Sequence, residues 1–125
     1  MTTSNEPLPT GLAVRRFKDP AYVELAPNLQ TLRDQIDDFD RQIVALMAAR
    51  ALRVRDATRF KKDAYQVSAP ARQAEVFKKV RNLASVHADN FPGFEGIVES
   101  AYRSLVAGFI AAEQSLFSQT EEVTS

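Results

Sequence analysis

The chain has 125 residues, and its sixteen Lys and Arg balance sixteen Asp and Glu, so the net charge is zero. This balance gives no overall field that favours nucleic acid or a membrane surface. The absence of cysteine, together with a single histidine, argues against disulfides, thiol catalysis and a zinc site. No apolar run reaches the ~18 residues of a membrane span, and the first residues lack a secretory-signal pattern. We therefore expect a soluble, cytoplasmic, single-domain protein with no metal and no cofactor.

Residues 1–28 contain four of the six prolines and keep neither helical nor strand periodicity. This composition predicts an extended or disordered N-terminal arm. A long helix is expected to follow from Leu29 to Lys62, with Asn28 as its N-cap. Along this segment apolar residues recur every three or four positions and form one seam: Leu29, Leu32, Ile36, Phe39, Ile43 and Leu46.

Two shorter helices are predicted after a break at residues 63–69. Pro70 suits the first turn of the second helix, whose apolar stripe would be Ala74, Phe77, Val80, Leu83 and Ala84. The third helix should begin between Pro92 and Gly96 and end near Phe117, with Val98, Tyr102, Leu105, Val106, Phe109, Glu113 and Leu116 on one side. The prediction is an all-α protein of three helices, with a helical domain over residues 29–117 and a frayed tail over 118–125.

The long helix also predicts a dimer. A helix of about 33 residues is about 50 Å long, whereas a 100-residue domain has a radius of gyration near 13 Å. Two shorter helices cannot cover its seam along the full length. We therefore expect an intertwined homodimer in which the long helices run antiparallel about a two-fold axis.

Three cations on this helix stand at informative spacings. Arg50 falls on the seam where an apolar residue is expected, so it either marks the end of the buried region or binds a ligand. Lys61 follows eleven residues later, about 17 Å along the same face, with the small Ala57 between them. Arg33 lies about 42 Å from Lys61 and can only join that site from the other subunit. This arrangement predicts an antiparallel crossing near Val44.

Several sequence motifs resemble the all-helical class of chorismate mutases, which includes the isochorismate-pyruvate lyases. The matching motifs are L-x-x-L-R-x-x-I-D-x-x-D-x-x-I at residues 29–43, the Arg50 that follows, R-F-K at 59–61, A-P-x-R at 69–72, and Y-R-S-L-V-x-x-F-I-A-x-E at 102–113. The resemblance runs from about Leu29 to Phe117, and the spacing of Arg33, Arg50 and Lys61 equals that of the family.

The resemblance implies a role for each matched residue. Arg50 and Arg33 of the neighbouring subunit would grip the two carboxylates of a dianionic substrate, with Arg72 near the substrate's edge. Lys61 would lie at the ether oxygen, where negative charge grows as the C–O bond breaks. Glu113 aligns with a Gln or Glu that donates to the same oxygen, and we expect it to be protonated when it does so. A shift of one residue would put Gln114 there instead.

The implied function is the rearrangement of chorismate to prephenate in the shikimate pathway of aromatic amino acid biosynthesis. The alternative is an isochorismate-pyruvate lyase, because many mutases carry an acid where this chain has Ala69, and the R-F-K and A-P-x-R motifs are more similar to the lyases. Glu113, in contrast, replaces the glutamine expected of a lyase. A non-catalytic helical dimer and a nucleic-acid binder also remain open, although the acids at residues 34–40 disfavour nucleic acid.

Overall fold

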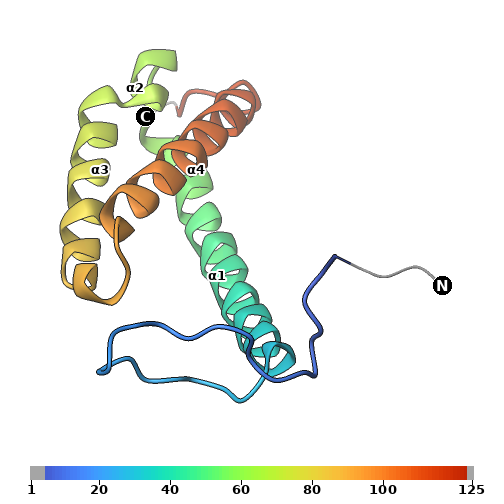
Figure 1. The fold of residues 1–125 in the computed structure, drawn as a ribbon. Helices are drawn as coiled ribbons and strands as arrows, with labels where there is room; N and C mark the ends of the chain where they lie inside the picture. Colours follow the sequence, from blue (N-terminus) through green and yellow to red (C-terminus); the bar gives the residue numbers. More distant parts are fainter. Residues whose placement is uncertain (1–4, 124–125) are drawn as a thin grey trace. The chain divides into compact units, whose positions relative to one another are not determined.

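Helices are the only regular secondary structure in the computed structural model, which describes residues 5–123. Their order along the chain is α1 (Leu29–Ala57), the 3₁₀ turn η1 (Thr58–Phe60), α2 (Ala64–Ser68), α3 (Pro70–Ser85), η2 (Ala88–Asn90) and α4 (Phe94–Phe117), as Figure 1 shows. The all-α class with one long and two shorter main helices is confirmed, and α2 is a further short helix. Within the described residues, no helix is both long and apolar enough to cross a membrane.

The chain divides into two compact units, the first ending at Ala48 and the second beginning at Ala49. In the first unit, residues 5–28 contain turns and bends but neither helix nor strand, while residues 1–4 of the predicted arm lie outside the described part. The backbone N–H of Gln30 donates to the carbonyl of Pro9 at 2.9 Å. Asn28 accepts the N–H of Thr31 through Oδ1 at 2.9 Å, which confirms it as the N-cap of α1.

The predicted end of the first helix is wrong. Helix α1 stops at Ala57, a 3₁₀ turn follows, and Lys61 is extended with φ −102° and ψ 135°. The segment 63–69, expected to be a break, contains α2, which Asp63 caps by accepting the N–H of Gln66 at 2.9 Å. No glycine or proline marks this change in the sequence. The turn instead coincides with the burial of Thr58. This burial depends on tertiary contacts, which the hydrophobic periodicity of the sequence does not show.

Helix α3 begins at Pro70, as predicted, directly after Ala69 in the left-handed conformation with φ 46°. The predicted stripe is right for Val80 and Ala84, which are buried, and for Phe77, which packs against the core; Val76 is buried as well. Leu83 is 63% exposed in the single chain, and Ala74 is also exposed. Alanine and leucine occur on several faces of a helix, so the positions of apolar residues alone did not show that Ala74 and Leu83 lie outside the buried face.

A small core joins α3 to α4, which lie against each other in the second unit (Figure 1). Val76, Val80 and Val106 are buried together, and Phe77, Val98, Tyr102 and Ile110 pack around them. The predicted start of α4 and its predicted inward side are confirmed, since Val106 and Glu113 are its buried residues. This core fixes the position of Glu113, a buried carboxylate near the C-terminal end of α4.

An exposed ion-pair network also links α3 to α4. Glu99 accepts from Arg103 Nε at 3.0 Å and from Arg81 Nη1 at 3.1 Å. The hydrogen bond from Arg103, followed by that from Arg81, lowers the pKa of Glu99. A carboxylate with a lowered folded-state pKa stabilises the fold above its ordinary titration range and loses that contribution as pH falls through the folded value.

Glu99→Gln is therefore expected to lower the melting temperature slightly at pH 7 and to have a smaller effect in strong acid, as the pH falls through the lowered pKa of Glu99. Thermal melts of both proteins at the two pH values measure the difference. Glu121→Gln, which removes an exposed carboxylate from the tail, is the control and should change neither melt. An equal loss of stability at both pH values would show that the ion pairs do not carry the effect.

Candidate active site

A cavity of about 290 Å³ lies within the second unit. It is enclosed by the end of α1, the segment around Lys61, and helices α2, α3 and α4. The lining residues are Arg50, Arg53, Val54, Ala57, Lys61, Val67, Ser68, Ala69, Arg72, Gln73, Val76, Val106, Phe109, Ile110 and Glu113. Apolar walls with a few convergent charged groups are the usual form of a small-molecule site, and the volume suits a compact ligand.

The charges of this lining are strongly unbalanced. Four cations (Arg50, Arg53, Lys61 and Arg72) and one carboxylate, Glu113, line a cavity in a chain whose net charge is zero. Concentrated positive charge between apolar walls raises the local concentration of anions. The cavity therefore favours a small ligand with more than one negative charge.

Arg50 is held by aromatic rings and not by an acid. Its Cζ atom lies 5.9 Å from the ring centroid of Tyr102 and 5.8 Å from that of Phe109. Among residues 5–123 it forms no ion pair. Cation–π contacts orient a guanidinium without neutralising it, so its donors are available for an anionic ligand.

Glu113 is 4% exposed and has two polar partners on the same oxygen. Its Oε2 atom accepts from Thr58 Oγ1 at 3.2 Å and from Lys61 Nζ at 3.4 Å. The side chain of Lys61 is 22% exposed, so the ammonium lies at the boundary between the buried carboxylate and the cavity. The structure thus brings Lys61 and Glu113 together, with Arg50 in the lining of the same cavity.

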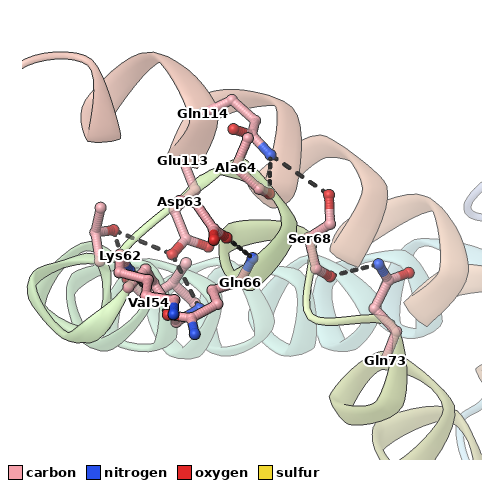
Figure 2. Close-up of polar contacts among 11 residues, drawn as sticks. Val54, Lys62, Asp63, Ala64, Gln66, Ser68, Gln73, Glu113 and Gln114 are labelled. Carbon is pink, nitrogen blue, oxygen red and sulfur yellow. Dashed lines mark hydrogen bonds and ion pairs between the residues drawn. The ribbon is translucent and has the colours of Figure 1, made fainter.

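Gln114 has a different place. Its Nε2 atom donates to the carbonyl of Ala64 at 3.0 Å and to Ser68 Oγ at 3.4 Å, and it is not among the lining residues. Figure 2 shows this side chain reaching α2, while Gln73 donates to the carbonyl of Ser68 at 2.6 Å. Gln114 ties α2 to α4, and Glu113 is the residue of the pair that faces the cavity.

Arg72 and Ala69 line the cavity from the start of α3. Arg72 is exposed and donates through Nη1 to Glu75 at 2.6 Å. Ala69 presents only a methyl group at the wall. This end of the cavity therefore carries one cation, Arg72, whose charge is partly neutralised by Glu75. It carries no acid at position 69.

Arg33 belongs to the first unit and is exposed, and it is not among the lining residues. Sequence reasoning missed four polar residues that line or support the cavity: Arg53, Thr58, Ser68 and Gln73. Arg53 is one turn beyond Arg50 and could have been found from the i, i+3 spacing. Thr58 carries no comparable signal, because its contact with Glu113 spans 55 positions of the sequence.

A family model described as chorismate mutase type II matches residues 32–114. The chain belongs to the type II chorismate mutase family. The matched segment contains Arg33, Arg50, Lys61, Arg72 and Glu113, and membership supports a chorismate mutase-type function in general. No curated protein matches the chain.

Proposed function

We propose that this protein is a chorismate mutase that converts chorismate to prephenate within aromatic amino acid biosynthesis. The observation that carries the proposal is the cavity itself, with four cations and one buried carboxylate inside the segment that matches the family. The reaction rearranges one bound molecule, and so requires neither a nucleophile nor a metal. Catalysis then consists of holding the compact conformer and placing fixed positive charge where the transition state gains negative charge.

Three of the four cations have separate tasks in this proposal. Arg50, oriented by its two aromatic neighbours, pairs through its planar fork with both oxygens of one substrate carboxylate. Lys61, a compact point charge at the cavity wall, faces the ether oxygen as the C–O bond breaks. Arg72 lies at the rim, where it contacts the edge of the substrate.

In the family arrangement, a cation from another subunit binds the second carboxylate of the substrate. We assign this role to Arg33 of a second copy of the chain. Support for a dimer comes from α1, none of whose residues is buried in the single chain. Its seam is open to solvent, with Phe39 62% and Leu46 70% exposed. Such an apolar face on a long helix requires a partner, and an antiparallel two-fold pairing that crosses near Val44 would cover it.

The proposed role of Glu113 predicts that activity depends on pH. A carboxyl group donates to the ether oxygen only when it is protonated, so activity is present at lower pH and is lost as pH rises and the proton leaves. Glu113→Gln supplies a permanent N–H donor and should flatten this fall. Profiles of kcat against pH for the two proteins test it. Glu95→Gln, on the same helix but outside the cavity lining, is the matched control and should keep the original profile. A pH profile that is unchanged in Glu113→Gln would exclude this role.

A second candidate is isochorismate-pyruvate lyase activity, which yields salicylate and pyruvate. The neutral wall at Ala69 favours it, since no acid stands there to bind the ring hydroxyl of chorismate. Purified protein offered chorismate and isochorismate in separate assays decides between the two. Prephenate supports the mutase, whereas salicylate with pyruvate supports the lyase. Turnover of neither substrate would reject both and leave a non-catalytic dimer or a nucleic-acid binder, the latter recognised by steep salt dependence.

A further inference from the structure

Thr58 is a buried hydroxyl at the junction between α1 and η1. It is 3% exposed, and its Oγ1 atom lies 3.2 Å from both the carbonyl of Val54 and Oε2 of Glu113. A threonine at a helix end usually satisfies its hydroxyl on the carbonyl four residues earlier, and here that carbonyl is Val54. The second contact, with a carboxylate on another helix, is not needed for that purpose.

Counting protons limits how the contacts can be made. A hydroxyl has one proton, so Thr58 donates either to Val54 or to Glu113. If it donates to Val54, its contact with Glu113 holds only when Oε2 itself carries a proton. Lys61 opposes that arrangement, because its ammonium also points to Oε2 and can only donate. The consistent arrangement has Thr58 and Lys61 both donating to Oε2.

The other oxygen of Glu113 has a different environment. Oε1 accepts no hydrogen bond from a described residue, and yet no buried side-chain atom in residues 5–123 is left without a partner. Oε1 is therefore not fully enclosed. Because Glu113 lines the cavity, Oε1 is the carboxylate oxygen that has no protein donor and is left for a ligand.

We propose that Thr58 is a positioning residue that determines which oxygen of Glu113 carries the acid proton. By donating to Oε2, it keeps that atom as an acceptor and directs the proton to Oε1, the oxygen without a protein donor. The inference rests on the proposed function, since it supplies the donor that Glu113 presents to the ether oxygen of the substrate. Thr58 itself does not line the cavity and acts only through Glu113.

The charged groups around Glu113 come from three parts of the second unit. Lys61 faces it from the segment after η1, Arg50 and Arg53 line the cavity from α1, and Arg72 lines it from α3. Helix α2 contributes only Val67 and Ser68, neither of which is charged.

Thr58→Val keeps the shape of the side chain and removes its proton, whereas Thr58→Ser keeps a hydroxyl. We expect Thr58→Val to lower kcat roughly tenfold with little change in KM, because the acid proton is no longer directed to the cavity. The fall of kcat with rising pH should also move to higher pH, since the ionised carboxylate has lost a donor. Thr58→Ser should retain both the rate and the pH profile.

A second measurement does not depend on turnover. The carboxyl carbons of ¹³C-labelled glutamate, followed by NMR in the full-length protein, report the titration of Glu113, whose signal is assigned by its absence from Glu113→Gln. Thr58→Val should move this titration to higher pH, and Thr58→Ser should not. Thr58→Ala replaces Thr58→Val if the latter does not fold.

The outcomes separate the two proposals. If the protein converts neither substrate, the proposed function fails, but the NMR titration still decides whether Thr58 donates to Glu113. If turnover is present and Thr58→Val changes neither kcat nor the titration, the role of Thr58 is overturned. A loss of melting temperature with an unshifted titration would also overturn it, because Thr58 would then serve only the packing of the fold.

Discussion

Lys61→Ala is expected to lower kcat by about a hundredfold or more while KM changes only a few fold. The Lys61 ammonium lies 3.4 Å from Glu113 Oε2, and Lys61 lines the cavity. In the proposed reaction it meets the negative charge that develops on the ether oxygen. An interaction that strengthens only in the transition state contributes to kcat and not to ground-state binding. Steady-state kinetics with purified protein measure both constants.

Lys62→Ala is the matched control. Lys62 is the adjacent cation, it is exposed, and its side chain is not part of the cavity lining. The control should keep the unsubstituted kcat. If Lys61→Ala kept it too, Lys61 could not be the cation at the ether oxygen, and the proposed mechanism would lose its main electrostatic contribution.

Mixing two inactive variants should restore activity. In the proposed homodimer, Arg33→Ala and Arg50→Ala each remove one carboxylate contact from both sites, and each should cost about a hundredfold in kcat/KM. In a mixed dimer, however, one site receives Arg50 from the first variant and Arg33 from the second. Random reassembly should return about a quarter of the unsubstituted activity, because half of the dimers are mixed and each has one intact site.

The control for this experiment pairs Arg50→Ala with Lys61→Ala. Both residues line the cavity of a single chain, so every site in the mixed dimer lacks one of them and no activity should return. Recovery in the first mixture alone assigns Arg33 to the partner's site. Failure of the first mixture, after exchange of subunits has been verified by mass spectrometry of the native dimer, would contradict the shared site.

The starts of the helices could be predicted from the sequence because local chemistry determines them. Asn28 caps α1 through its own side chain, and Pro70 opens α3 at a position that needs no N–H donor. The inward side of α4 was also predictable, since its large apolar residues occupy one face only. These are properties of a few neighbouring residues and do not depend on the rest of the fold.

The end of α1 could not be predicted, because it depends on a contact between distant residues. The predicted unbroken helix face from Arg50 to Lys61 was consequently wrong, although both residues line the same cavity. The burial of Thr58 against Glu113 was equally invisible, since an isolated threonine in a basic run has no distinguishing pattern. The sequence indicated several of the residues that line the cavity and missed the turn that brings Lys61 to Glu113.

The left-handed backbone of Ala69 has a consequence for how substrate preference can diverge in this family. Asparagine and aspartate adopt this conformation more readily than other residues with a side chain, so an acid can replace Ala69 without a change of the backbone. Pro70 directly after it holds the start of α3 in place. A lineage could therefore exchange a neutral wall for an acidic one by a single substitution, and acquire a different ring-hydroxyl preference without rebuilding either helix.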